Sequence, residues 1–419
     1  MGNKMFNVVE TFSGIGSQAK ALRNIGFNAN IVATADWDIN AIIAYDLIHH
    51  GKQDLTAYNH YSEQQLNEEL SKFTLSADGK SAMTEKAKKV LPIHLKKMLL
   101  YAIRRSNNLV SITDIKGKDI SDNIDLLTYS FPCQDLSVCG FWHGNTSGID
   151  RDANNRSGML WEVERILEEM FKLGKKMPKF LLMENVSNIL SKTHEKNFNE
   201  WKGFLSSLGY YNVVYKLNAK DFGIPQKRER VYMLSVLVGN DALKLMELKR
   251  YLDEHKLENI NEINRLKRRE ISLREILKIN YEENPLYREE ANYSQPNDTP
   301  SRQRIFEKND VLYDGVNIKD IIVNTVTTKQ DRHPNSGVIV YDSGRSGKAV
   351  YRNLTPRECF LLMGFDEEDF QILIENNIDV NKRRKLFTKE KLIKMAGNSI
   401  VVDVLEVIFR QIREIEEIL

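Results

Sequence analysis

Short apolar segments that alternate with helical segments constrain the fold of this chain more than any other feature of its sequence. The chain opens with an apolar segment from Phe6 to Phe12, a glycine-containing turn, a helical stretch from Ser17 to Ile25 and a second apolar segment from Ile31 to Ala35. This order is typical of a βαβ unit. Repeated alternation predicts an α/β fold with a mostly parallel sheet covered by helices. Further apolar segments, each followed by a loop or helix, lie at 124–129, 179–183 and 231–234.

The length of the chain favours two domains. Its 419 residues, of which 42% are hydrophobic, can bury a sizeable core. A polar, lysine-rich and helix-prone stretch at 41–113 is typical of an insertion within the sheet domain. We expect a catalytic and cofactor-binding domain at 1–239 that includes this insertion, a second domain at 240–389, and a C-terminal segment at 390–419 that returns to the first domain.

Local patterns in the second half support this division. The stretch at 241–279 is helical and highly charged, and the content of Asn, Pro, Ser and Asp at 284–301 predicts a loop. Strand-like pieces lie at 320–328 and 337–341, and a helix at 399–418 closes the chain.

Composition excludes several classes of protein. No stretch approaches the roughly twenty apolar residues of a membrane span, and the start lacks the apolar run of a signal peptide, so we expect a cytoplasmic protein. The three cysteines, Cys133, Cys139 and Cys359, lack Cys-x-x-Cys spacing, which argues against a disulfide framework or a metal site. At least one thiol is then free to react. The formal charge of +2 neither requires nor excludes nucleic acid.

The turn after the first apolar segment has the composition of a nucleoside site. Phe12-Ser13-Gly14-Ile15-Gly16 lets backbone approach a ligand, and Asp36 follows about twenty residues later, where a carboxylate accepts from ribose hydroxyls. The third glycine of the dinucleotide pattern and a phosphate-binding Lys-Ser/Thr pair are missing. S-adenosylmethionine fits this pattern, with Phe12 and Trp37 around the adenine and Asp114, beside Ile115, accepting from its amine. Taken singly, the glycines suit an ordinary turn and Trp37 a core position.

Two short motifs supply a nucleophile and an acid. Phe131-Pro132-Cys133-Gln134 places a thiol on a stiff backbone, because proline fixes its own φ. Glu184-Asn185-Val186 supplies a carboxyl group that can serve the same substrate. A lone cysteine is more often a small buried hydrophobe and a lone glutamate a solvated residue, so neither defines a function without the motifs that accompany it.

Three further motifs complete a set whose order and spacing resemble one enzyme family. They are Gln226-Lys227-Arg228-Glu229-Arg230, Arg352-Asn353-Leu354-Thr355-Pro356-Arg357-Glu358 and Gly397-Asn398-Ser399. Together with the first two motifs they resemble the cytosine-C5 DNA methyltransferases of bacterial restriction-modification systems. The resemblance covers nearly the whole chain except 41–113 and about 240–345. It implies a Rossmann-like methyltransferase fold with a smaller target-recognition domain, S-adenosylmethionine as cofactor and double-stranded DNA as partner.

The resemblance also implies a covalent mechanism. The Cys133 thiolate would attack C6 of a cytosine, and C5 would then accept the methyl group. Glu184 would donate a proton to N3, for which it needs a raised pKa. Arg230 would bind the O2 carbonyl and favour the thiolate by its positive charge.

Other residues take supporting roles in this family. Asn185 would hold the turn that contains Pro132 by hydrogen bonds, and Arg228 would steady the catalytic loop and a phosphate. Asn398 and Ser399 would return to the cofactor pocket from the last helix. The base that removes the C5 proton is not identified, and water is a candidate.

Attack on C6 requires the cytosine to leave the duplex, at an unstacking cost of about a few kcal/mol. The stretch at 134–158, rich in Gly, Ser and Asn, resembles the family's mobile loop that closes over DNA. Its composition also suits an inert surface loop. Within it, Ser137 and Arg156 are expected to contact DNA.

The stretch at 240–345 occupies the family's target-recognition position. Thr325-Val326-Thr327 resembles a short Thr-rich element near its end. Long polar side chains that reach major-groove edges follow, although such a run equally suits a solvent loop. These side chains are Lys329, Gln330, Arg332, His333 and Asn335. The expected DNA contacts outside the catalytic loop are Gln226, Thr325, Thr327, Lys329 and Arg332.

Two departures from the family and three rivals remain. Asp36 stands where Glu is usual, and the insertion at 41–113 is long for compact bacterial members.

A transfer-RNA cytosine methyltransferase would use the same Cys and Glu, but the large 240–345 stretch argues against it. The presence of Cys133, Glu184 and Arg230 argues against a catalytically silent DNA-binding relative. The absence of the pyrophosphate-binding pattern argues against a nicotinamide oxidoreductase. We expect a monomer, with a cognate restriction endonuclease as a possible partner.

Overall fold

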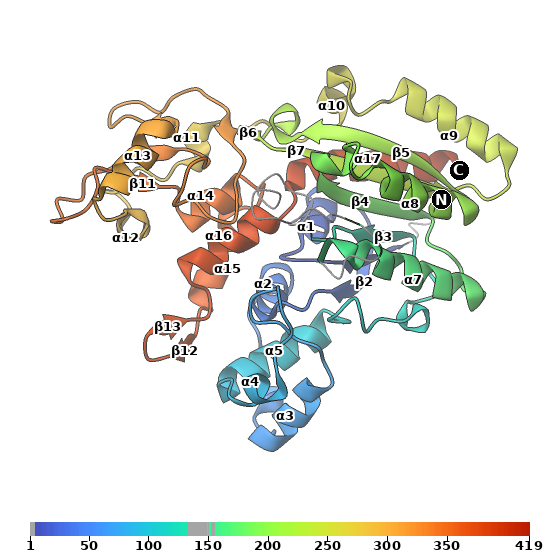
Figure 1. Cartoon of the computed structure of the whole chain (residues 1–419), viewed down its shortest axis with the longest axis horizontal. Helices are drawn as coiled ribbons and strands as arrows, with labels where there is room; N and C mark the ends of the chain where they lie inside the picture. Colours follow the sequence, from blue (N-terminus) through green and yellow to red (C-terminus); the bar gives the residue numbers. More distant parts are fainter. Residues whose placement is uncertain (1–4, 133–148, 150, 152–155) are drawn as a thin grey trace. The chain divides into compact units, whose positions relative to one another are not determined.

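The computed structural model describes residues 5–132, 149, 151 and 156–419. The chain forms two compact units, coloured along the sequence in Figure 1. Unit 1 comprises residues 1–217, 229–266 and 408–419, and unit 2 comprises residues 218–228 and 267–407.

A six-stranded sheet organises unit 1, with the strand order β2-β1-β3-β4-β7-β5. β1 pairs in parallel with β2 and β3, β3 pairs in parallel with β4, and β4 pairs antiparallel with β7. The predicted α/β fold with a mostly parallel sheet is confirmed. The strands are β1 (Phe6–Thr11), β2 (Ala29–Ala35), β3 (Leu126–Tyr129), β4 (Phe180–Val186), β5 (Tyr210–Asn218) and β7 (Glu229–Leu237).

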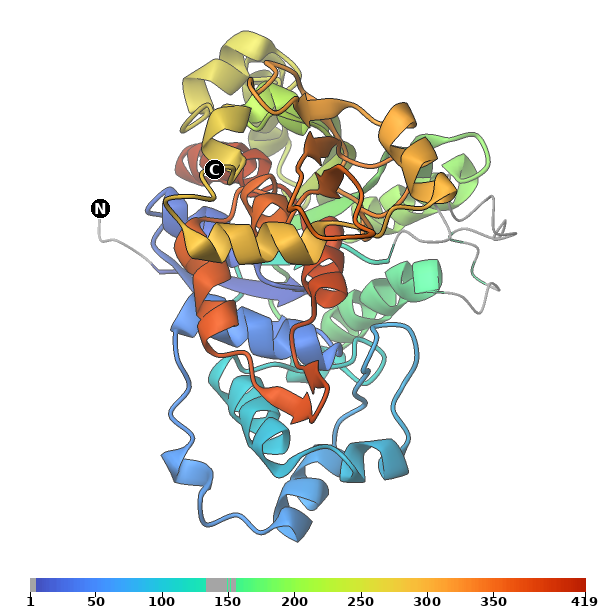
Figure 2. The same cartoon turned by 90° about the vertical axis from the view of Figure 1, so that its left-hand side faces the viewer.

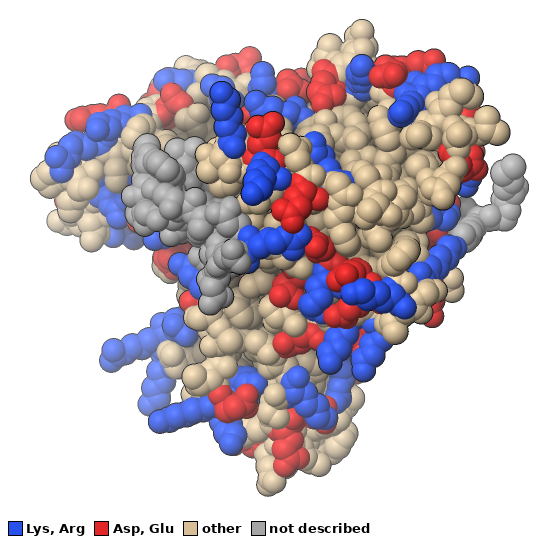
Figure 3. All heavy atoms as spheres, turned by 45° about the vertical axis from the view of Figure 1, so that its right-hand side comes forward, with Lys and Arg blue, Asp and Glu red and all other residues tan. Residues whose placement is uncertain are grey.

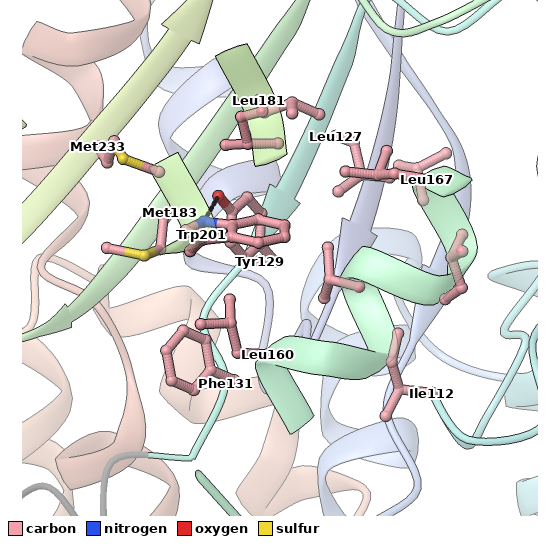
Figure 4. Close-up of a cluster of buried hydrophobic side chains, with 14 of the residues drawn as sticks. Ile112, Leu127, Tyr129, Phe131, Leu160, Leu167, Leu181, Met183, Trp201 and Met233 are labelled. Atoms are coloured by element: carbon pink, nitrogen blue, oxygen red, sulfur yellow. Dashed lines mark hydrogen bonds between the residues drawn. The ribbon is translucent and has the colours of Figure 1, made fainter. Parts of the chain in front are cut away.

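One face of this sheet is covered by two helices, α7 (Leu160–Lys172) and α8 (Glu195–Ser207). Alternate strand residues, among them Tyr129 and Met183, point into this cluster, as the period of two in a strand requires. Figure 4 shows Trp201 of α8 against Tyr129, and its Nε1–H donates a hydrogen bond to the Tyr129 hydroxyl at 3.1 Å. The helix face and the alternating strands therefore form one continuous core.

The region predicted as an insertion contains helices, but it begins later than expected. Almost every residue of α2 (Ile39–His50) is buried, because its sequence is apolar on all sides. The residues from 41 to 48 are therefore core, and the added segment starts after α2. Its helix α5 packs against α2 and α3, and α3 packs against α4, as Figures 1 and 2 both show. These helices are η1 (Thr56–Tyr58), α3 (Glu63–Ser71), α4 (Glu85–Lys89) and α5 (Ile93–Arg105).

The remaining helical elements of unit 1 lie between and after the strands. They are α1 (Ser17–Asn24), η2 (Gly117–Asp119), η3 (Arg156–Met159), η4 (Ser187–Leu190), α9 (Ala242–Glu254) and α10 (Ile260–Leu266). In the described part of the chain, no helix has the length and apolar content to cross a membrane.

Unit 2 combines short helices with small sheets. One sheet has the order β11-β10-β8, and two strand pairs join β12 with β13 and β6 with β9. The strands are β6 (Gln226–Lys227), β8 (Val311–Tyr313), β9 (Val323–Asn324), β10 (Val338–Val340), β11 (Tyr351–Asn353), β12 (Asp379–Asn381) and β13 (Arg384–Lys385). The helices are η5 (Ala219–Phe222), α11 (Leu273–Ile276), α12 (Pro285–Ser294), α13 (Pro300–Lys308), α14 (Pro356–Leu361), α15 (Glu367–Glu375) and α16 (Lys389–Asn398).

The loop predicted at 284–301 is wrong for most of its length. Asn284 is the N-cap of α12, its side chain accepts from the Leu286 N–H, and Pro285 occupies the first helical turn. Thr299 and Pro300 start α13 in the same way. Asn-Pro and Thr-Pro pairs therefore mark helix starts here, because a capping oxygen satisfies a free N–H and proline has none to satisfy.

The two units differ from the expected domain limits in three places. Residues 218–228 and 390–407 belong to unit 2, and residues 240–266 belong to unit 1. Residues 240–266 contact the end of α17 (Val402–Ile418). The Tyr251 hydroxyl and the Arg265 guanidinium both bind the Glu414 carboxylate, at 2.5 and 2.7 Å. Contacts between residues so far apart in sequence leave no local pattern.

Trp201→Ala is expected to lower the free energy of unfolding by about 3–5 kcal/mol, because it leaves a cavity in the core and removes the bond to Tyr129. Urea denaturation measures the loss. Phe171→Ala on α7, where the side chain is 57% exposed, is the matched control and should cost less than about 0.5 kcal/mol. Similar losses for the two variants would contradict this account of the core.

Candidate active site

Four neighbouring strands of unit 1 end at one edge of the sheet. Thr11 of β1 is in register with Ala35 of β2 and with Tyr129 of β3, and Tyr129 is in register with Met183 of β4. Because the strands are parallel, the segments that follow them gather at this carboxyl edge. The cofactor motif and the Pro-Cys motif follow β1 and β3, and the Glu-Asn motif forms the last three residues of β4, so the described parts of the three lie together.

The glycine turn after β1 is tied to the end of β2. Phe12, Gly14 and Gly16 have φ values of 55°, 54° and 81°, in the left-handed region that favours glycine. The Gly14 N–H donates a hydrogen bond to Asp36 Oδ2 at 2.9 Å. A Cβ added at Gly14 would meet nothing within 4 Å, so a ligand can approach this backbone closely.

The residues around the turn fit a nucleoside. The second carboxylate oxygen of Asp36, Oδ1, accepts from the Asp38 N–H at 2.8 Å, so backbone N–H groups on both sides hold the carboxylate in place. Phe12 and Trp37 are half-buried, Asp114 is exposed and Ile115 is buried. Half-buried rings and a fixed carboxylate suit an adenosyl group. We therefore keep these residues as the proposed cofactor site.

Two polar side chains, the fully buried Glu10 and the half-buried His49, lie behind the turn, and sequence reasoning missed both. His49 of α2 contacts the Ile15 carbonyl oxygen through Nε2 at 2.9 Å, and burial lowers the pKa of its imidazole to about 3. Burial also raises the pKa of Glu10 on β1 to about 8, an effect that contact with Tyr45 only partly offsets. A Cβ added at Gly16 would lie 2.1 Å from His49 Nε2, so this glycine is required by a close approach. In the sequence, His49 shows no motif and Glu10 is one polar residue in an apolar strand.

Glu184 and Arg230 lie together on neighbouring strands. Val186 of β4 is paired with Arg230 of β7, so Glu184, two residues earlier, is on the same face of the sheet. Arg230 Nε lies 3.4 Å from Glu184 Oε1, and the two side chains are 17% and 13% exposed. A carboxyl group and a guanidinium thus stand beside the end of β3, where a substrate can contact both.

Asn185 connects the end of β3 to β4. Its Nδ2 donates to the Phe131 carbonyl oxygen at 3.1 Å, and its Oδ1 accepts from the Val186 N–H at 2.9 Å. Asn185 and Phe131 are buried, whereas Pro132 is half-buried. Cys133, Gln134 and Ser137 lie outside the described residues, as does the side chain of Arg156, whose backbone begins η3.

Cys359 is the one cysteine within the described residues, and it is an unsuitable nucleophile. It is fully buried on α14, and burial raises the pKa of its thiol well above the usual range. The described part of the chain has no group of three or more His, Cys, Asp or Glu side chains arranged to hold a metal ion.

Gln226 and Arg228 correct two sequence predictions. The Gln226 side chain is fully buried, donates to the Leu362 carbonyl oxygen at 2.7 Å and accepts from the Val326 N–H at 2.9 Å, so it is not placed to contact DNA. Arg228 is 4% exposed and donates to three carbonyl oxygens at 2.7 to 3.0 Å. Burial against these carbonyls places it inside unit 2 and not on a phosphate. The three carbonyls belong to Val326, Gly397 and Ser399.

The expected DNA-reading segment divides into buried and exposed side chains. Gln330 and Asn335 are buried, and Asn335 Nδ2 donates to the Gln330 carbonyl oxygen at 2.8 Å, so they shape the loop. Lys329, Arg332 and His333 are exposed and remain available to a partner.

The threonines and the last motif are held within unit 2. The Thr325 and Thr327 hydroxyls donate to the Lys227 and Lys329 carbonyl oxygens at 2.6 and 2.7 Å. At the end of α16, Asn398 is exposed, whereas the buried Ser399 donates to a carbonyl of the preceding turn.

Solved methyltransferase structures share this fold. The Dnmt2 methyltransferase of S. pombe matches with a TM-score of 0.58 at 17% identity, over 98% of this chain and 99% of the other. The methyltransferase EhMeth of Entamoeba histolytica matches with a TM-score of 0.57 at 17% identity, over 98% of each chain. The fold is therefore that of a methyltransferase.

Sequence comparison specifies the family. A family model described as C-5 cytosine-specific DNA methylase matches residues 89–414. Orphan methyltransferase M.SssI of Spiroplasma monobiae is 33% identical over 98% of this chain and 97% of its own length. Type II methyltransferase M2.ScrFI of Lactococcus lactis subsp. cremoris is 32% identical over 97% and 99%. The chain belongs to the C-5 cytosine-specific DNA methylase family, which confirms the resemblance. It is a DNA cytosine-C5 methyltransferase, and its cofactor is S-adenosylmethionine.

Glu10→Gln is expected to remove a pH dependence of stability. Glu10 holds its proton up to pH about 8 when folded but loses it near pH 4.5 when unfolded. The free energy of unfolding therefore falls as the pH rises between these values, by up to about 1.4 kcal/mol per pH unit, and this contribution is level above pH 8. Glutamine is neutral in both states, so the free energy of unfolding of the variant should increase relative to that of the wild type as the pH rises.

Urea unfolding at several pH values measures this difference. Glu307→Gln, an exposed position on α13, is the control and should follow the wild-type curve. Parallel curves for Glu10→Gln and the wild type would mean that Glu10 is ionised in the folded protein.

Arg228→Ala is expected to lower the free energy of unfolding by roughly 2–4 kcal/mol, because it leaves buried carbonyls without donors. Arg230→Ala, which removes the 3.4 Å pair with Glu184 and a hydrogen bond to the adjacent Glu229 carbonyl, should cost less, about 1–2 kcal/mol. Thermal unfolding of both variants compares them. The reverse order would contradict the structural role of Arg228.

Proposed function

We propose that this enzyme methylates cytosine within one short DNA sequence, through a covalent bond between Cys133 and the target base. The Glu184–Arg230 pair carries the proposal, because it stands 3.4 Å apart beside the strand that leads to the Pro-Cys motif. An acid and a cation next to a thiol are the groups that addition to a pyrimidine ring needs.

In the proposed reaction, the Cys133 thiolate adds to C6, and Glu184 delivers a proton to N3 as the ring electrons shift. The enamine carbon C5 then takes up a methyl group. Loss of the C5 proton to a base restores the ring double bond, expels the thiolate and returns the N3 proton to Glu184. Arg230 binds the O2 carbonyl, so negative charge on the ring is balanced throughout.

S-adenosylmethionine, when bound, supplies an electrophilic methyl group on a positively charged sulfur. The glycine turn from Phe12 to Gly16 would hold it through the backbone, Asp36 through the ribose, and Trp37 and Asp114 through the adenine. Asn398 and Ser399 are the proposed contribution from the Gly-Asn-Ser motif. Because the turn is tied to Asp36 by the Gly14 N–H, both halves of the site are set before the cofactor arrives.

Asn185 is proposed as a positioning residue for the nucleophile. Its hydrogen bond to the Phe131 carbonyl fixes the backbone two residues before Cys133, and proline restricts the residue between them. Ser137 and Arg156 of the catalytic loop remain proposed DNA contacts, made when the loop closes over a flipped base.

Unit 2 is proposed to read the DNA sequence. Lys329, Arg332 and His333 are exposed, carry donors and follow the Thr325–Thr327 element. Gln226 and Arg228 support this element from within, since both bind the backbone of Val326. Reading and anchoring are thus assigned to different side chains.

The proposed setting is a restriction-modification system, in which methylation protects a target sequence from a partner endonuclease. The supporting relatives are named as an orphan methyltransferase and a type II methyltransferase. We propose a monomer that acts on double-stranded DNA in the cytoplasm.

Bisulfite sequencing of unmethylated DNA incubated with the protein and S-adenosylmethionine tests the function at single-base resolution. Protected cytosines should lie in one short sequence context. Cys133→Ala should abolish protection while retaining cofactor binding, because it removes the nucleophile alone. Cys359→Ala is the matched control and should keep protection, since that thiol is buried in unit 2.

Full protection by Cys133→Ala would overturn the covalent mechanism. No protection on DNA that contains all short contexts would favour a transfer-RNA substrate or a silent relative. The same assay on transfer RNA separates these two outcomes.

A further inference from the structure

The backbone just after β2, where Asp36 and Trp37 are proposed to bind the cofactor, is held by the side chain of Asn108, which follows the added helices in the sequence. Asn108 Oδ1 accepts from the Asp36 N–H, and Asn108 Nδ2 donates to the Asp36 carbonyl oxygen, both at 3.2 Å. The same Oδ1 accepts from the Val110 N–H at 2.8 Å, and Asn108 is 6% exposed. The carboxamide therefore satisfies both backbone groups of the residue proposed to bind the ribose.

A second attachment lies one residue further along the same segment. The Ser76 N–H donates to the Trp37 carbonyl oxygen at 2.8 Å, and the Ile39 N–H donates to the Ser76 carbonyl oxygen at 2.9 Å. Asn40 Nδ2 donates to the Ala77 carbonyl oxygen at 3.2 Å. The loop after α3 thus runs alongside the residues proposed to bind the nucleoside.

Buried side chains join the helices of this segment to one another and to the loop that carries Ser76. Lys88 of α4 is buried and donates to the Phe73 carbonyl oxygen at 3.0 Å, which fixes the chain just before Ser76. Lys96 of α5 is fully buried and binds Glu63 of α3 at 2.7 Å. The loop and the helices are therefore joined by buried polar contacts, which hold the loop in one position beside the residues proposed to bind the cofactor.

Charge on this segment does not indicate a phosphate-binding surface. The lower part of the space-filling view in Figure 3, which α3, α4 and α5 occupy, shows Lys and Arg beside Asp and Glu. Arg104 and Lys72, for example, both bind Glu69, at 3.0 and 2.6 Å. Pairing of this kind offsets part of the positive charge of the segment, and its contacts with the residues proposed to bind the cofactor are the more specific observation.

We propose that the segment from 51 to 110 is a clamp on the cofactor site, and that Asn108 is its principal positioning residue. Asn108 fixes the backbone of Asp36, whose carboxylate in turn binds the N–H groups of Gly14 and Asp38. A carboxylate held in place before binding loses less conformational freedom when the ribose arrives. The proposal rests on the proposed role of Asp36.

Isothermal titration calorimetry with S-adenosylmethionine, in the absence of DNA, tests the clamp directly. Asn108→Ala should weaken binding roughly tenfold, because the free energy lost when Asp36 is no longer held in place is similar to that of about one hydrogen bond. In turnover assays it should raise KM for S-adenosylmethionine while kcat changes less than about twofold.

Asn107→Ala is the matched control. Asn107 is adjacent and exposed, and its Nδ2 donates to the Val32 carbonyl oxygen at 2.7 Å, away from Asp36. It should reduce thermal stability without weakening cofactor binding. Equal weakening by both variants would mean that any damage to this loop has the same effect, which overturns the assignment to Asn108.

A double-mutant cycle with Asp36→Ala shows whether Asn108 acts through Asp36. Asn108→Ala should add little to the loss that Asp36→Ala causes, because the carboxylate it positions is already gone. Additive losses would overturn the clamp. Asn108→Asp, which keeps the side-chain volume, replaces Asn108→Ala in this cycle if the alanine variant does not fold. Unchanged binding by Asp36→Ala would instead refute the proposed cofactor site and leave the backbone contacts of Asn108 as a structural feature.

Discussion

The common end of four parallel strands is the constraint on which the rest of unit 1 depends. Register brings the ends of β1, β2, β3 and β4 to one edge, so the described parts of motifs far apart in sequence meet there. The core beneath this edge, with Trp201 against Tyr129, keeps β3 in place. A shift of one strand by one residue would reverse the faces of its side chains and separate the acid from the cofactor turn.

Burial decides the chemistry beneath the cofactor turn. Desolvation drives Glu10 and His49 toward their neutral forms by the same physical cause. A neutral imidazole has one N–H, and the contact of Nε2 with the Ile15 carbonyl assigns the proton to that nitrogen. Nδ1 is then an acceptor and faces Arg23 at 3.5 Å. The turn is consequently held by a neutral donor whose strength does not vary with pH near neutrality.

The sequence predicted the catalytic framework better than its supports. Apolar runs followed by glycine or polar turns identified β1 to β4 and β7, and parallel pairing then placed their motifs at one edge. β5 was missed because its residues are mostly half-buried and alternate weakly. Gln226 and Arg228 were misplaced because their burial depends on backbone groups about a hundred residues away. Asn108 has no motif, since its partners are backbone atoms that any sequence supplies.

The anchoring of Val326 by Gln226 and Arg228 has a consequence for how such enzymes diversify. The anchor binds only main-chain atoms of the Thr325–Thr327 element, so it tolerates any side chain there that fits. The contacts of Gln226 and Arg228 with the Val326 backbone do not involve the exposed side chains that follow the element. Under the proposed assignment of DNA reading to these exposed residues, new target preferences can arise by exchange of a short surface segment, while the frame that presents it is inherited unchanged.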